Sequence, residues 1–240
     1  MMERHSLVKS ISLHLLPGLL VVAFYLLVAP ILNHQGYPSI LALGLAAFFG
    51  IVPLQLGHLY YKGYQLNGKL SLKGIIIPTQ SMTVLKFTGW LIASLVILVL
   101  IGGVSFVFES NIKSMLFGWL PNWYFYDSNF QSYSKEALLI TAWVRLAVDG
   151  VVLPITEELY FRGYLFHRLP ENIKNKWIMG AFLFAVYHFW QPWNYASLFL
   201  ISLVLIAPVV KFNNVYLSIA IHMFANIIGT ILFFGQINQL

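Results

Sequence analysis

Long runs of apolar residues, separated by short polar connections, dominate the pattern of this chain. A membrane-spanning helix needs about 20 consecutive, mainly apolar residues. Seven runs approach or exceed that length, and they cover roughly residues 11–32, 39–61, 85–108, 137–165, 176–190, 195–210 and 215–235. The pattern predicts an all-α fold, a polytopic transmembrane helical bundle of about seven spans that forms a single membrane domain over residues 1–240. An eighth helix is an alternative, within the long fourth run or the connection after the third.

Three of these runs depart from a regular span. The fourth is over-long and contains Pro154; because proline removes a backbone donor and usually kinks a helix, we expect a break near residues 150–154. The fifth and sixth runs are short, and at about 1.5 Å per residue each covers less than the hydrocarbon core of about 30 Å. We expect the hairpin that they form to end below the outer surface and to leave a depression there.

Aromatic residues concentrate in the connection over residues 109–136 and at the turn of that hairpin. Such residues are enriched where a membrane meets water, so one interpretation of the connection is an interfacial belt. The other is a lid over a substrate groove. At the hairpin turn we interpret Trp190 and Trp193 as interface anchors.

Composition supports a membrane location and limits the possible partners. The chain is 59% hydrophobic and 9% charged, whereas soluble domains carry about 25% charged residues.

The Lys and Arg residues in alternate connections number ten on one side against two on the other, which predicts a cytoplasmic N-terminus and an outside C-terminus. The short, lysine-marked connections favour a bacterial plasma membrane. The lysines beside the spans predict lipid contact and no nucleic-acid binding, and the absence of cysteine excludes thiolate chemistry.

Candidate chemistry begins in the fourth run with Glu157, Glu158 and Arg162. Ionisable residues inside an apolar span are costly and point to function. Glu158 and Arg162 are spaced i, i+4 and can pair on one face of a helix. Glu157 is turned about 100° away, which leaves it free to act as a base. Arg145 and Asp149 share the same spacing, and we interpret them as a structural ion pair.

Two later runs add His188 and the i, i+4 pair His222 and Asn226. Counted along each helix, Glu157, His188 and His222 lie at similar depths, so the three can meet. A carboxylate with one histidine can activate water, and the second histidine with asparagine can stabilise an oxyanion. This chemistry is amide hydrolysis within the membrane. The same Glu157, His188 and His222 could instead hold a zinc ion with water as the fourth ligand.

These residues form three motifs, Glu157-Glu158-x-x-x-Arg162, Phe184-x-x-x-His188 and His222-x-x-x-Asn226. In this order on three spans they resemble the CPBP family of intramembrane proteases, the CAAX prenyl endopeptidases and their Abi relatives. The resemblance covers a catalytic core of about residues 140–235.

The resemblance implies roles for each position. Glu157 and His188 would activate water, His222 and Asn226 would stabilise the oxyanion, and Glu158 and Arg162 would support the site. Zinc dependence and a metal-free glutamate mechanism have both been considered for the family, and we favour the metal-free form.

Three functional hypotheses follow. The first is an endopeptidase that cleaves a membrane-associated, lipidated or leader-bearing peptide; its peptide or membrane-protein substrate would enter through the bilayer, with lipids as further partners. The second is a non-catalytic scaffold or bacteriocin-immunity protein that binds a partner enzyme. The third is a proton-coupled transporter using Glu157 and Asp149. Inverted-repeat symmetry between the two halves would favour it, but the sequence does not show such symmetry.

Overall fold

The computed structural model describes residues 3–77, 79–126 and 130–239, and it is built almost entirely from helices. In chain order the elements are α1 (Leu7–His34), α2 (Ser39–Asn67), α3 (Val84–Phe117), η1 (Asn122–Tyr124), η2 (Phe130–Ser132), α4 (Lys135–Ala147), η3 (Val148–Val152), α5 (Leu153–Glu157), η4 (Glu158–Leu165), η5 (Phe166–Arg168), α6 (Lys176–Tyr187), η6 (Pro192–Asn194), α7 (Tyr195–Phe212) and α8 (Val215–Ile237). The predicted all-α fold is confirmed.

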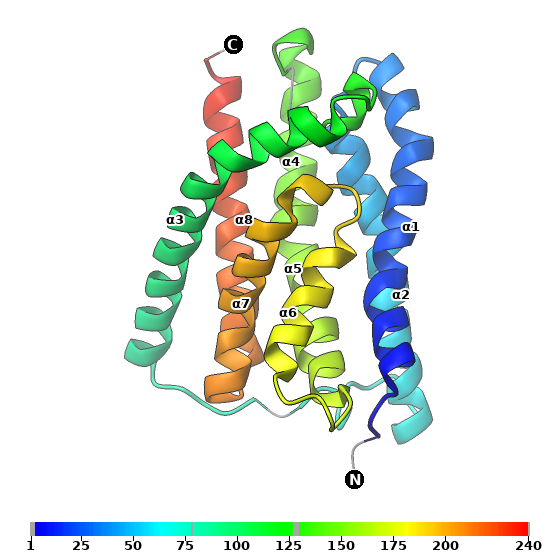
Figure 1. Cartoon of the computed structure of the whole chain (residues 1–240), viewed down its shortest axis with the longest axis vertical. Coiled ribbons are helices and arrows are strands. Elements are labelled where there is room, and N and C mark those ends of the chain that lie inside the picture. Colours follow the sequence, from blue (N-terminus) through cyan, green and yellow to red (C-terminus); the bar gives the residue numbers. More distant parts are fainter. Residues whose placement is uncertain (1–2, 78, 127–129, 240) are drawn as a thin grey trace.

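Helices occupy all seven regions in which spans are predicted. Among the described residues, six helical stretches are long and apolar enough to cross a membrane: α1, α2, α3, the stretch Lys135–Arg168, the stretch Pro192–Phe212, and α8. The seventh helix, α6, has 12 residues, which is about 18 Å and too short to cross the hydrocarbon core. The chain passes back and forth along one direction, and its two ends lie at opposite ends of the bundle (Figure 1).

The central span, Lys135–Arg168, is one continuous helix, so the break expected near Pro154 is wrong. Backbone angles directly before the proline are helical, with φ −68° and ψ −47° at Val152 and φ −65° and ψ −48° at Leu153. The winding changes instead, because η3 and η4 are π-helical. A π-turn joins each N–H to the carbonyl five residues back. The helix therefore continues past the proline, which has no N–H to donate, with a changed winding around it.

The hairpin between α6 and α7 turns well below the upper ends of α1 and α8, as predicted, and α3 passes above the turn in this view (Figure 1). Glu109 of α3 accepts a hydrogen bond from Ser197, and the ring of Phe117 lies 5.7 Å from that of Trp193. Trp190 and Trp193 are 6% and 2% exposed. Their interpretation as interface anchors is wrong, because both rings are buried: that of Trp193 packs against Phe117 of α3, and that of Trp190 packs against Tyr187 and His188.

The aromatic connection after α3 contacts the turn of the same hairpin. The ring of Tyr124 packs 6.2 Å from that of Trp193, and the Tyr126 hydroxyl donates a hydrogen bond to Gln191 in the hairpin turn. Trp119, at 78% exposure, fits the interfacial belt. The structure therefore supports the lid interpretation for the segment around Tyr126, while residues 127–129 lie outside the described part of the chain.

The main core lies between α1, α2, η4 and α6. Its fully buried side chains include Tyr25 of α1, Leu59 of α2, Tyr160 of η4 and Phe184 of α6. Each comes from an apolar run of the sequence. Large apolar side chains of this kind pack closely between helices, and this packing forms the core. The carboxylates of the central span lie beside this core.

Candidate active site

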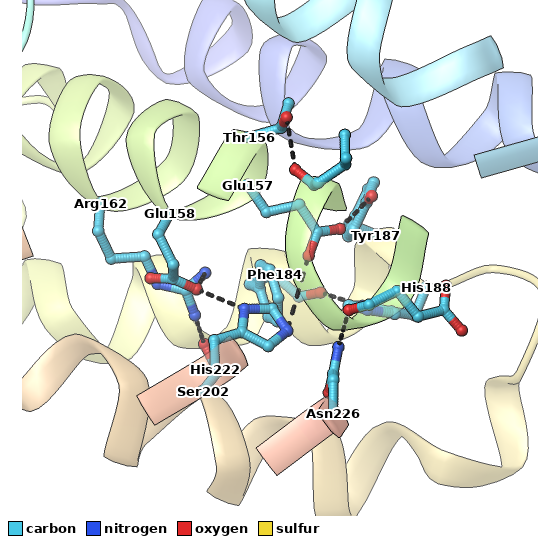
Figure 2. Close-up of polar contacts among 12 residues, drawn as sticks. Thr156, Glu157, Glu158, Arg162, Phe184, Tyr187, His188, Ser202, His222 and Asn226 are labelled. Carbon is cyan, nitrogen blue, oxygen red and sulfur yellow. Dashed lines mark hydrogen bonds and ion pairs between the residues drawn. The ribbon is translucent and has the colours of Figure 1, made fainter. Parts of the chain in front are cut away.

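Two adjacent carboxylates lie in the middle of the central span and meet different partners. Glu157 and Glu158 are 5% and 0% exposed. Glu158 Oε1 lies 3.1 Å from Nη1 of Arg162. Arg162 also donates from Nη2 to Ser202 Oγ of α7, at 2.8 Å, and its Cζ lies 3.9 Å from the ring centre of Phe184 (Figure 2). Arg162 thus meets a carboxylate, a hydroxyl and an aromatic face, while Glu158 Oε2 has no hydrogen-bond partner among the described residues.

His222 of α8 lies between the two carboxylates (Figure 2). Its Nδ1 is 2.9 Å from Glu158 Oε1, and its Nε2 is 3.9 Å from Glu157 Oε2. An ionised carboxylate only accepts hydrogen bonds, so we assign the proton to Nδ1. Glu158 therefore orients the imidazole ring, and Nε2 is directed towards the space beside Glu157.

Glu157 is held from its other side by Tyr187, the last residue of α6. The Tyr187 hydroxyl donates to Glu157 Oε1 at 2.7 Å, which leaves Oε2 on the side of His222. Tyr187 is not one of the six predicted site residues. α6 ends at Tyr187, and His188 follows with φ −80° and ψ 57°. The Tyr187 hydroxyl reaches Glu157, while His188 lines the cavity.

One ring nitrogen of His188 has no hydrogen-bond partner among the residues that the structure describes. Its Nδ1 lies 2.8 Å from the carbonyl oxygen of Phe184, and because a carbonyl accepts, Nδ1 is the donor. Nε2 is then the unprotonated nitrogen in a neutral ring. The imidazole packs between aromatic rings, 4.8 Å from the centres of both Phe184 and Trp190. These contacts fix the ring at the edge of a cavity in the bundle.

Asn226 satisfies a backbone carbonyl that the proline leaves without its partner. In η3 the N–H of Leu153 bonds to the carbonyl of Val148, five residues earlier. The next donor in this register would be Pro154, which has no N–H. The Asn226 side chain donates instead to the Asp149 carbonyl, at 2.8 Å. Asn226 thus keeps one amide N–H for another acceptor.

A cavity of about 480 Å³ connects these groups. Its polar lining comprises Tyr126, Arg145, Asp149, Glu157, His188, Gln191, His222 and Asn226. Apolar side chains of α2, α3, α7 and α8 complete the wall, among them Ile51, Leu98 and Leu205. The structure thus places four of the six predicted site residues on one cavity, with Glu158 and Arg162 directly behind them.

The proposed zinc ligands Glu157, His188 and His222 do not form a three-ligand cluster. Over residues 3–77, 79–126 and 130–239, no group of three His, Asp or Glu side chains is placed to share a metal ion. Glu157 Oε2 and His222 Nε2 lie 3.9 Å apart, and the nearest fixed partner of His188 is a backbone carbonyl. As arranged, these side chains do not fit a bound zinc ion.

Comparison with known proteins supports the resemblance drawn from the motifs. Residues 139–228, which carry all three motifs, match the family model described as type II CAAX prenyl endopeptidase Rce1-like. The site-bearing segment is similar to the Rce1-like family. The chain is also 30% identical over 80 residues to the UPF0177 protein YxdF of Lactococcus lactis subsp. lactis (strain IL1403).

The alignment with YxdF covers 33% of this chain and 45% of that protein, so the chain spans less than half the length of this relative. No solved structure matches the chain. With its six apolar helices of membrane-crossing length, this is an integral membrane protein, and its site-bearing segment is similar to Rce1-like proteases.

Proposed function

We propose that this protein is an intramembrane endopeptidase that hydrolyses a peptide bond of a membrane-associated, lipidated or leader-bearing peptide. One observation carries the proposal: Glu157, His188, His222 and Asn226 line a single cavity inside the helical bundle. A carboxylate and imidazoles around a buried cavity are the groups that general acid–base hydrolysis needs. The similarity of residues 139–228 to Rce1-like proteases supports the same reaction class.

In the proposed reaction Glu157 Oε2 accepts a proton from water while the water oxygen attacks the peptide carbonyl carbon. The unprotonated Nε2 of His188 orients the same water. Negative charge moves to the carbonyl oxygen. There His222, in this step protonated on both ring nitrogens, donates from Nε2, and the remaining N–H of Asn226 donates a second hydrogen bond. The tetrahedral intermediate then collapses, the C–N bond breaks, and the proton held by Glu157 passes to the leaving nitrogen.

This mechanism assigns no step to a metal ion. The donor arrangement supports that choice, because the described Glu and His side chains do not converge as a three-ligand set. Nδ1 of His222 already donates a hydrogen bond to Glu158 at 2.9 Å. This contact is that of a carboxylate that orients a catalytic histidine. Glu157 then acts as the base directly.

We propose that the peptide or membrane-protein substrate reaches the cavity through the bilayer. Leu95, Leu98 and Val99 of α3 form part of the cavity wall. Among the residues of α3 only Ser94 is buried, so this wall is a single helix that contacts lipid over most of its surface. A lightly packed helix opens more easily than the buried core, and lipids are the expected neighbours of this face.

The decisive experiment compares wild type with Glu157→Gln and His188→Ala in proteoliposomes that contain membrane-anchored and prenylated reporter peptides. General acid–base groups contribute about 10²–10⁴-fold to rate, so both variants should lose cleavage by at least about a hundredfold. Glu136→Gln, an exposed carboxylate on the same span, is the matched control and should cleave at the wild-type rate. A chelator should have no effect.

Other outcomes would change the assignment. Loss of cleavage on chelation that added zinc restores would make Glu157, His188 and His222 metal ligands. Wild-type rates in both variants would overturn the site and favour a non-catalytic scaffold or immunity protein.

We also propose a bacterial plasma membrane location with the N-terminus in the cytoplasm and the C-terminus outside. The termini lie at opposite ends of the bundle (Figure 1), and basic residues concentrate at the end that holds the N-terminus. The chain has no cysteine, so single cysteines at the exposed Lys69 and Gln236 can be labelled in intact cells. An impermeant reagent should label only the Gln236 position, and labelling of Lys69 alone would reverse the orientation.

A further inference from the structure

Tyr187 contacts Glu157 directly although it occupies a variable position of the second motif, Phe184-x-x-x-His188. Its hydroxyl donates to Glu157 Oε1 at 2.7 Å, while Oε2 faces His222 at 3.9 Å (Figure 2). Tyr187 is 0% exposed, so bulk water does not compete for the phenolic O–H. The two oxygens of the carboxylate therefore have different environments, one held by a hydrogen bond and the other open to the cavity.

The packing around Tyr187 holds its ring in one position. Its ring centre lies 5.0 Å from that of Phe161 on the central span, 5.8 Å from Phe184 and 5.4 Å from Trp190. Aromatic contacts on three sides restrict rotation of the side chain. The hydroxyl is thus presented to Glu157 by the surrounding core.

Helix α1 holds the backbone of Tyr187 as well. A Cβ atom added at Gly18 of α1 would lie 1.9 Å from the Tyr187 carbonyl oxygen, so only glycine lets the two segments approach this closely. That carbonyl also accepts from the N–H of Phe189, at 2.9 Å. Helix α1 lies outside the segment that matches the Rce1-like family, yet it determines where Tyr187 sits.

We propose that Tyr187 is a positioning residue for Glu157, which holds Oε1 so that Oε2 points at the substrate cavity, and that α1 supports it through the contact at Gly18. The inference rests on the proposed hydrolytic function. A hydrogen bond donated to a carboxylate favours its ionised form, so Tyr187 both orients the base and keeps it ready to accept a proton.

Tyr160 provides a matched control. It is also a buried tyrosine, 1% exposed, and it also contacts α1, but through its hydroxyl, which donates to the Leu13 carbonyl at 3.1 Å. Tyr160→Phe therefore removes the same atom from the same core without removing a hydrogen bond to Glu157. A general packing or stability effect should appear in both variants, whereas a positioning effect should appear only in Tyr187→Phe.

The test combines a spectroscopic readout with kinetics. The infrared carboxylate band of Glu157 is identified as the band that Glu157→Gln lacks, and it should shift in Tyr187→Phe and stay in place in Tyr160→Phe. Loss of a hydrogen bond to a charged group should lower kcat by about tenfold to a hundredfold. KM should stay within about twofold, and the acidic limb of kcat/KM should move to higher pH in Tyr187→Phe alone.

Each outcome decides the question. A shifted band together with a lower kcat in Tyr187→Phe only would support the proposal. An unshifted band, a shifted band with a wild-type kcat, or equal kinetic losses in both tyrosine variants would overturn it. Full activity of Glu157→Gln would overturn the proposed function instead, and the band shift would still report whether the hydrogen bond exists.

Discussion

Two arginine–carboxylate pairs of the same sequence spacing lie on the central span, and their surroundings differ. Arg145 and Asp149 are i, i+4, with Nε and Oδ2 3.5 Å apart, and their side chains are 27% and 29% exposed. Glu158 and Arg162 are also i, i+4, with Oε1 and Nη1 3.1 Å apart, but their side chains are 0% and 2% exposed. The first pair faces the cavity, and the second is sealed behind the site.

Burial gives the Glu158–Arg162 pair contacts with other helices that the cavity-facing pair of the same spacing does not make through its charges. Glu158 also binds Nδ1 of His222, and Arg162 also donates to Ser202, so the sealed pair joins three helices. Asp149 contributes its backbone carbonyl to Asn226, a contact that does not involve its charge. We infer that the sealed pair is needed for the geometry of the site and that the cavity-facing pair is not.

The largest expected effect comes from Arg162→Gln. Removing one member of a buried ion pair leaves the other charge uncompensated, which costs about 3–5 kcal/mol. Thermal unfolding in detergent should show this loss in free energy, and reporter cleavage should disappear because Glu158 no longer holds His222 correctly. A variant with wild-type melting and cleavage would contradict the role assigned to the sealed pair.

A smaller loss of stability is expected when both members of the sealed pair are replaced, in Glu158→Leu with Arg162→Met. Replacing a whole buried pair with apolar residues of similar volume is often neutral or stabilising, so melting should return close to wild type. Cleavage should remain absent, since His222 loses the acceptor of its Nδ1 proton. If cleavage recovered along with stability, Glu158 would not be the residue that orients His222.

The smallest effect is expected for Arg145→Gln. Ion pairs that remain partly solvated contribute about 1 kcal/mol or less, so the melting temperature should fall only slightly and cleavage of the reporters should persist. Melting measured beside Arg162→Gln in the same detergent gives the comparison directly. Equal losses in the two variants would show that exposure to the cavity does not distinguish the pairs.

The positions of the helices followed well from the apolar runs, while their ends did not. The third run was expected to end near residue 108, yet α3 continues to Phe117. A length criterion stops at the charged Glu109, but Glu109 is accommodated by its hydrogen bond with Ser197 of α7. The break predicted at Pro154 failed for a similar reason, since Asn226 of α8 supplies the donor for the carbonyl left open there.

The candidate site was predictable in part. Motif spacing placed Glu157, His222 and His188 on three helices, and the structure brings all three to one cavity. Tyr187 and Ser202 carried no signal, because each acts through a partner on another helix. The catalytic roles proposed for Glu157, His188 and His222, and the absence of a metal step, remain predictions for the experiments above.

Run length and composition were enough to establish that this chain is a membrane-embedded helical bundle, because hydrocarbon admits few other arrangements of the backbone. The three motifs were enough to identify a protease-like set of polar groups. Only packing between helices distinguishes the carboxylate held by Arg162 and His222 from the one held by Tyr187. The physical reason is that the environment of a buried charge depends on neighbours far away in sequence, and those neighbours meet only when the bundle has assembled.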